Sequence, residues 1–145
     1  MKMGKARFFL IRKNNTNENL VKKGAYIVKD FDNYDATILS TGSEVEIAYQ
    51  ASLELEKNKL YLRVVSIPCF EIFNDQTTEY KNKILGTKIR FGIEAGVING
   101  WEKYIYEENF IGMKTFGASG PYKKLYKYFG ITSDNLINKI KQNIK

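Results

Sequence analysis

The chain contains no histidine and only one cysteine among its 145 residues. Without histidine, a serine or cysteine catalytic triad of the usual kind is excluded, and so are most zinc sites. Cys69 has no second cysteine with which to form an intrachain disulfide, and no imidazole is present to activate its thiol. We therefore expect Cys69 to be a buried or half-buried structural residue.

Long apolar runs are also missing. No segment approaches the roughly 20 apolar residues that span a membrane. The start of the chain leads into only a few apolar residues, Phe8 to Ile11, which do not form a signal peptide. No G-x-G-x-x-G fingerprint and no P-loop lysine follow any predicted strand. These absences predict a soluble protein of the cytoplasm that does not contact a membrane.

Acidic residues are outnumbered, with 16 Asp and Glu against 23 Lys and Arg and a net charge of +7. Such a balance can indicate a nucleic-acid partner. Here, however, the lysines occur singly or in pairs, as at Lys22-Lys23 and Lys123-Lys124, and asparagines often accompany them. This scatter is typical of a solvated surface, and we predict no nucleic-acid partner.

What the chain does have is one clear strand-turn-helix unit, within a length suited to a single domain. Residues 36–39 are apolar and partly β-branched, as in a strand buried on both faces. The chain breaks at Gly42 and continues as a predicted helix over 44–57. Ser43 is the predicted N-cap, with Glu46 closing a capping box.

The same turn predicts a candidate anion site. Thr41, Gly42 and Ser43 offer N–H groups and hydroxyls at the amino end of a helix, where an anion gains from both hydrogen bonds and the helix dipole. The alternative is that Ser43 caps its helix and binds no ligand. Both interpretations stay open at this point.

Further strands and helices alternate along the chain. The predicted strands cover 25–28, 60–67, 88–94 and 110–113; the predicted helices cover 75–85, a short segment with Trp101, 121–129 and 133–143, the last capped by Thr132 or Ser133. This alternation predicts a three-layer α/β/α domain with a mostly parallel sheet. The later aromatic residues are expected to pack in the core or at an interface.

The first 23 residues differ from the rest. Residues 6–12 form an apolar run with strand character, and a polar, asparagine-rich stretch follows them up to Lys23. A strand without a nearby partner, placed before a linker, predicts the tail of a preceding domain. We therefore expect a boundary between residues 1–23 and a domain over residues 24–145.

Five motifs together resemble one family. They are S-T-G-S-E-V at Ser40–Val45, R-V-V-S-I-P at Arg63–Pro68, I-E-A-G followed by Trp101, G-M-K-T-F-G-A-S-G-P at Gly112–Pro121, and F-G-I-T-S-D-N at Phe129–Asn135. In this order and spacing the chain resembles the C-terminal domain of transketolases, thiamine-diphosphate enzymes of the pentose phosphate pathway that transfer a two-carbon ketol group between sugar phosphates. The resemblance implies a five-stranded mixed sheet whose first strand is antiparallel.

The resemblance also gives Arg12 a role. In this family the last strand of the pyrimidine-binding domain carries a serine-arginine-glutamine-asparagine motif whose arginine binds the substrate phosphate. Ile11-Arg12-Lys13-Asn14 stands in that place, so Arg12 would bind the sugar phosphate. A guanidinium suits phosphate because its planar donors match the oxygens. Ile11 and Lys13 depart from the motif, and the alternative for Arg12 is a surface arginine that ends a strand.

The family binds thiamine diphosphate and magnesium on its other domains. The resemblance therefore implies no catalytic, cofactor or metal residue in this chain and no activity of the chain alone. It implies a structural role in which the domain packs on the other domains and contributes to the homodimer, with a regulatory ligand site as a further suggestion. Two alternatives are a free-standing regulatory or assembly module that binds an anionic metabolite at Gly42-Ser43, and the equivalent domain of a 2-oxoacid dehydrogenase β subunit. The motifs at Arg63–Pro68 and Phe116–Pro121 argue against the second.

Overall fold

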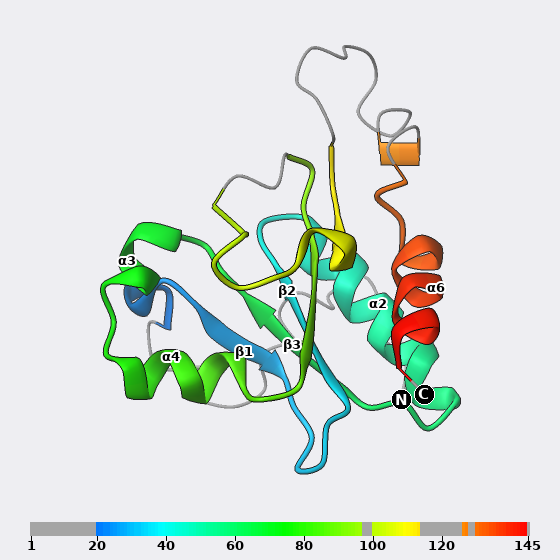
Figure 1. The fold of residues 1–145 in the computed structure, drawn as a ribbon, viewed down its shortest axis with the longest axis horizontal. Helices are drawn as coiled ribbons and strands as arrows, with labels where there is room; N and C mark the ends of the chain where they lie inside the picture. Colours follow the sequence, from blue (N-terminus) through cyan, green and yellow to red (C-terminus); the bar gives the residue numbers. More distant parts are fainter. Residues whose placement is uncertain (1–19, 97–99, 114–125, 128–129, 145) are drawn as a thin grey trace.

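The computed structural model describes residues 20–96, 100–113, 126–127 and 130–144. The elements with defined bounds within these residues are five strands, four helices and two short 3-10 turns, and Figure 1 shows how they are arranged. They are η1 (Leu20–Lys23), β1 (Tyr26–Lys29), β2 (Ala36–Ser40), α2 (Glu44–Lys57), β3 (Leu62–Ser66), α3 (Phe70–Asn74), α4 (Thr78–Leu85), β4 (Ile89–Ile93), η2 (Glu107–Asn109), β5 (Phe110–Ile111) and α6 (Ser133–Asn143).

The strands form one mixed sheet in the order β1-β3-β2-β4-β5. Strand β1 runs antiparallel to β3, while all the other neighbours are parallel. Strand β2 lies at the centre, where Ile38 pairs with Val64 of β3 and with Phe91 of β4. This sheet confirms the mostly parallel α/β fold that the sequence pattern predicts and the antiparallel first strand that the family resemblance implies.

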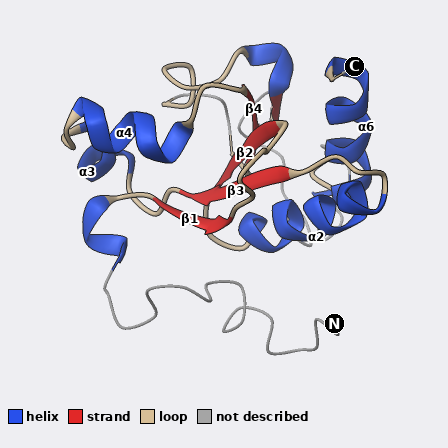
Figure 2. Ribbon diagram, turned by 90° about the horizontal axis from the view of Figure 1, so that it is seen from below, coloured by secondary structure: helices blue, strands red, loops and turns tan. Residues whose placement is uncertain are grey.

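Helices cover the sheet on both faces, as Figure 2 shows in side view: α2 and α6 lie on one side, α3 and α4 on the other. Alternate residues of β2 therefore enter different cores, Ile38 on the α2 side and Leu39 on the α4 side. The α2–α6 core also contains Ala48, Leu55, Val64, Phe91, Leu136 and Ile140. The α3–α4 core also contains Val65, Ile67, Phe73, Ile84, Leu85, Trp101 and Ile105.

The predicted capping box at α2 is wrong. Ser43 already has helical backbone angles, with φ −68° and ψ −20°, and its side chain makes no capping bond. Its Oγ donates instead to Glu44 Oε2 at 2.7 Å. At α6 the prediction is confirmed for Thr132, whose Oγ1 accepts a hydrogen bond from the Asn135 N–H at 3.2 Å.

The helix predicted over 75–85 is confirmed as α4 but begins later than predicted, and a separate short helix precedes it. Thr77 is extended, and its Oγ1 accepts a hydrogen bond from the Tyr80 N–H at 3.1 Å, so α4 begins only at Thr78. The apolar residues before it form the separate helix α3. The short helix predicted at Trp101 is also wrong, because residues 100–104 form turns in which Tyr104 and Ile105 both donate to the Trp101 carbonyl.

The remaining predictions have mixed outcomes. Of the predicted helix over 121–129 only Tyr126 and Lys127 are described, and both are helical. The predicted strand over 6–12 lies outside the described residues. Cys69 is partly buried, as predicted. Among the helices described, none combines the length and the apolar character that crossing a membrane requires.

Candidate functional site

The order of the strands marks one end of the sheet as the place to look for a site. The chain runs from β2 through α2 to β3 and then returns past β2 to β4, with α3 and α4 on the opposite face. A crevice at the carboxyl ends of β2 and β4 is the usual ligand position in such sheets. The turn at 41–43 follows β2 at this end, and Glu94 and Ala95 follow β4.

Glu44 lies at this end of the sheet. It is the first residue of α2 and only 5% exposed. Its Oε1 accepts hydrogen bonds from the Ala95 N–H at 2.7 Å and the Tyr126 hydroxyl at 2.9 Å, and its Oε2 accepts one from Ser43 Oγ. A carboxylate at a helix amino end is also stabilised by the helix dipole. Glu44 therefore ties α2, the end of β4 and the segment at Tyr126 together.

Glu94 is the second carboxylate at this end of the sheet. Its Oε2 accepts a hydrogen bond of 2.6 Å from Nε1 of Trp101, which is fully buried. Burial raises the pKa of Glu94 above its ordinary value; the Trp101 hydrogen bond lowers it, and the charge of Glu44 raises it further. The side chain can therefore keep a proton at a higher pH than a free glutamate.

The chemistry open to this pair is limited. A carboxyl group with a raised pKa can donate or accept a proton, but the oxygens of Glu44 are engaged with donors of the chain itself. No group of three or more metal-ligating side chains gathers anywhere in the part of the chain that the structure describes. The hydrogen bonds of Glu44 and Glu94 therefore form a structural clasp, which joins the start of α2 to the segments that follow β4.

The predicted anion site at Thr41, Gly42 and Ser43 lies on the outer side of this clasp. Gly42 has φ +57°, which a tight turn into the helix requires, and both Gly42 and Ser43 are exposed. A Cβ at Gly42 would lie 4.0 Å from Glu44 Oε2, so an anion bound at this turn would have a carboxylate as a neighbour. The anion site stays a prediction. Arg12 lies outside the described residues.

Glu44 and Glu94 are site residues that the sequence analysis missed. A signal was present, because Glu44 follows shortly after the predicted strand over 36–39 and Glu94 is the last residue of the predicted strand over 88–94. Parallel strands bring their carboxyl ends to one edge, so the two positions should lie close together. The contribution of Tyr126 had no such signal, since its contact with Glu44 joins positions 82 apart in the sequence.

Comparison with known proteins gives a consistent result. The family model of the transketolase-like TK C-terminal domain matches residues 24–132. The chain is 37% identical over 135 residues to a transketolase of Cereibacter sphaeroides, covering 92% of the chain and 20% of the relative. It is 42% identical over 126 residues to the chloroplastic transketolase of Solanum tuberosum, covering 83% and 17%. The chain thus spans about a fifth of the length of these curated relatives.

Solved structures agree with this result. The chain resembles transketolase from Leishmania mexicana with a TM-score of 0.78 and 39% identity, over 84% of the chain and 18% of that protein. It resembles transketolase from Campylobacter jejuni with a TM-score of 0.76 and 35% identity, over 85% and 19%. A split gene transketolase with 16% identity and a TM-score of 0.61 shares the fold. The chain belongs to the transketolase family, whose C-terminal domain its residues 24–132 form.

Proposed function

We propose that this chain acts as the C-terminal domain of a transketolase, an enzyme that transfers a two-carbon ketol group between sugar phosphates. The observation that carries the proposal is the family match over residues 24–132, joined to the fold shared with whole transketolases at 39% identity. The domain packs on the other domains of the enzyme and contributes to its homodimer. The cytoplasm expected from the sequence belongs to this proposal, although one of the relatives is chloroplastic.

The cofactors of the family belong to the parent enzyme in this proposal. Thiamine diphosphate supplies the group on which transketolases carry the ketol unit, and magnesium holds its diphosphate. The described residues do not fit these groups, because they bring no three metal-ligating side chains together. The carboxylates of Glu44 and Glu94 accept hydrogen bonds from donors of the chain itself. We therefore assign no step of the reaction to this chain.

A domain exchange tests the proposal. Residues 24–145 of this chain would replace the C-terminal domain of the Campylobacter jejuni transketolase, with the same enzyme lacking that domain as the control. We expect the hybrid to be a dimer that converts xylulose 5-phosphate and ribose 5-phosphate, and the truncated control to lose dimer and activity. A hybrid that is folded by circular dichroism but no better than the control would contradict the proposed role.

The isolated chain provides a second test. Supplied with both sugar phosphates, thiamine diphosphate and magnesium, it should show no turnover. Turnover by the isolated chain would overturn the assignment of all chemistry to other domains.

For Arg12 we propose contact with the substrate phosphate. A hybrid that begins at residue 6 of this chain, and so includes Arg12, allows the test. Arg12→Gln should raise KM for xylulose 5-phosphate about 10- to 100-fold, since a charge-assisted hydrogen bond contributes about 1.5–3 kcal/mol. Lys13→Gln, one position away, is the matched control. Equal effects of the two changes would argue against a specific role of Arg12.

The alternative of a 2-oxoacid dehydrogenase β subunit is answered by the family match. The other alternative, a regulatory module that binds an anion at Gly42-Ser43, is separated by a thermal-shift screen of phosphates and nucleotides. A ligand that binds the folded chain raises its melting temperature. The melting temperature of a regulatory module should rise with one of the phosphates or nucleotides. That of a domain with only a packing role should rise with none.

A further inference from the structure

A hollow of the molecule lies at the opposite end of β4 from Glu94. It has a volume of about 300 Å³ and lies beside the amino end of β4 and the following turns. Its walls are Lys88, Ile89, Arg90, Glu102, Lys103, Tyr104, Ile105 and Tyr106. Three of these side chains are basic and one is acidic, so the hollow, which we call the Arg90 pocket, is a region of positive charge.

Arg90 is a half-buried cation without a carboxylate among the described residues. Its guanidinium donates only to backbone carbonyls, to Gly86 at 3.0 Å and to Tyr104 at 3.3 Å. Its Nε is buried and has no hydrogen-bond partner among those residues. Arg63, the other arginine that the structure describes, differs because its Nε and Nη2 both donate to Asp30.

Removing a cation from water without an opposite charge is costly, and backbone carbonyls offset only part of that cost. Arg63 shows that this domain can supply a carboxylate to an arginine on the same sheet. At Arg90 the compensating negative charge is absent from the described residues, which leaves a place for an anion from outside. An arginine fork with free N–H groups is matched to phosphate or carboxylate oxygens.

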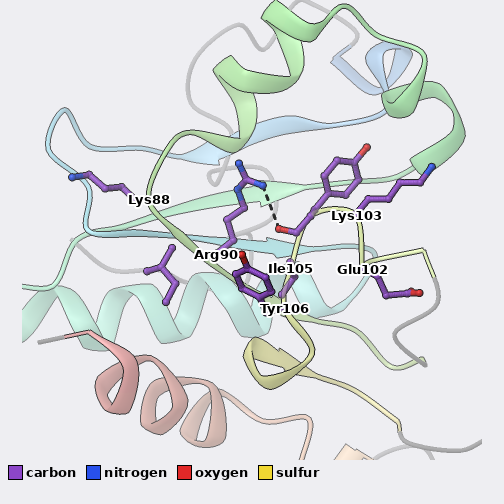
Figure 3. A pocket seen from close by; sticks show the side chains of 8 residues that line it. Lys88, Arg90, Glu102, Lys103, Ile105 and Tyr106 are labelled. Carbon is purple, nitrogen blue, oxygen red and sulfur yellow. Dashed lines mark hydrogen bonds between the residues drawn. The ribbon is translucent and has the colours of Figure 1, made fainter.

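The surroundings indicate more than a bare anion. Figure 3 shows Lys88 and Lys103 on opposite sides of Arg90, with the Tyr106 ring near the centre of the view. Tyr106 is 76% exposed and Ile89 is 37% exposed, which makes them two of the few large apolar side chains that the described surface leaves in solvent. A concave site of this size, with an exposed ring beside a cation, suits a ligand with a planar apolar part.

We propose that the Arg90 pocket binds a small organic anion, a phosphate monoester or a carboxylate that carries a planar ring. Arg90 binds the charged group and the two lysines add positive charge on either side of it, while Tyr106 and Ile89 contact the ring. The inference rests on the pocket alone and does not depend on the role in a transketolase. It also differs from the predicted anion site at the Gly42 turn, which lies at the other end of the sheet.

The test uses the whole 145-residue chain labelled with ¹⁵N. Phenyl phosphate and inorganic phosphate are titrated in parallel, and amide shifts are followed at Ile89 and over 103–106. We expect saturable shifts with phenyl phosphate, with a dissociation constant on the order of 1 mM, and binding of inorganic phosphate about tenfold weaker. The affinity for inorganic phosphate therefore measures how much of the binding comes from the charged group alone.

Three variants make the test specific. Lys88→Gln with Lys103→Gln should weaken both ligands about tenfold, because each exposed charge contributes up to about 1 kcal/mol. Tyr106→Ala should remove the preference for phenyl phosphate while inorganic phosphate binds as before. Lys141→Gln, on the exposed side of α6, is the matched control and should change neither. All four of these residues are exposed, so we expect the variants to fold, and Arg90 itself can remain.

Each remaining outcome would overturn the proposal. These are the absence of saturable shifts up to roughly ten times the expected dissociation constant, equal weakening by Lys141→Gln, and shifts that map to 41–43 instead. The proposal would also be overturned if neither phosphate shifts the amides of the pocket but those amides become protected from solvent in the hybrid transketolase. That result would make the pocket a contact surface between domains.

Discussion

Gly24 and Gly42 both have a positive φ, yet their surroundings differ, and this difference predicts unequal sensitivity to substitution. A Cβ at Gly24, with φ +83°, would lie 2.3 Å from Phe73 N and 2.6 Å from Cys69 O, so the backbone itself would have to move. At Gly42, with φ +57°, the nearest atom would be 4.0 Å away. Only the first substitution adds a collision to the conformational cost.

We therefore expect Gly24→Ala to lower the free energy of unfolding by about 2–5 kcal/mol and Gly42→Ala by about 1–2 kcal/mol. Urea unfolding followed by circular dichroism measures both. Gly42→Ala serves as the control for the cost of a positive φ alone. Equal losses would show that the close approach of Gly24 to α3 does not restrict the fold.

Glu94 predicts a pH dependence of stability. Burial raises the folded-state pKa of Glu94 above its unfolded value, so the folded chain binds the proton more tightly. The corresponding stability is present below the unfolded pKa and is lost as the pH rises through the folded pKa. Glu94→Gln cannot titrate, and its amide oxygen can still accept from Trp101 Nε1.

The free energy of unfolding of Glu94→Gln, measured against the unchanged chain, should therefore rise with pH across the acid range. Urea unfolding at a series of pH values gives this difference. Glu71→Gln, an exposed residue of α3, controls for the loss of one negative charge. A flat or falling difference for Glu94→Gln would mean that the carboxyl group gains as much from Trp101 as it loses by burial.

At the scale of elements, the two predicted caps show what sequence can and cannot provide. Thr132 and Ser43 both precede amphipathic helices, but only Thr132 has extended angles, with φ −138° and ψ 156°, that let its hydroxyl reach the first turn. The hydroxyl of Ser43 instead donates a hydrogen bond to the carboxylate of its neighbour Glu44. Residue type indicates a cap, but tertiary contacts decide whether it forms.

Thr132→Ala should accordingly destabilise the domain by about 1 kcal/mol, since one N–H of the first turn of α6 loses its partner. Ser133→Ala is the matched control, because Ser133 is already helical and should change stability by only a few tenths of a kcal/mol. Thermal unfolding of both variants provides the comparison. A larger loss of stability for Ser133→Ala than for Thr132→Ala would show that Ser133, and not Thr132, caps α6.

At the scale of the whole molecule, the sequence predicted the sheet well because its central strands are buried on both faces. Ala36–Ser40 is a continuous run of apolar or small residues, and Leu62–Ser66 is one apart from Arg63; such runs have few alternatives to a buried strand. The antiparallel first strand came only from the family resemblance. The hydrogen bonds of Glu44 to Ala95 and Tyr126 join segments that are distant in the sequence, and local periodicity does not contain such contacts.

The domain boundary predicted near residue 24 can be tested on the whole chain. Among the described residues, the buried members of both cores begin at Ala25 and the sheet begins at Tyr26, which agrees with the boundary predicted from the sequence. Removing residues 1–19 should therefore change the free energy of unfolding by no more than about 0.5 kcal/mol. Removing residues 133–145 is the control, and it should unfold the domain because Leu136 and Ile140 are fully buried against α2.

Urea unfolding of the two truncated chains beside the full chain measures both effects. Several protein concentrations are needed, since association would make the apparent stability depend on concentration. A loss above roughly 2 kcal/mol on removing residues 1–19 would exceed what a surface segment contributes. Those residues would then belong to the packed domain, and Arg12 would lose its place on the strand of a neighbouring domain from which the contact with substrate phosphate was inferred.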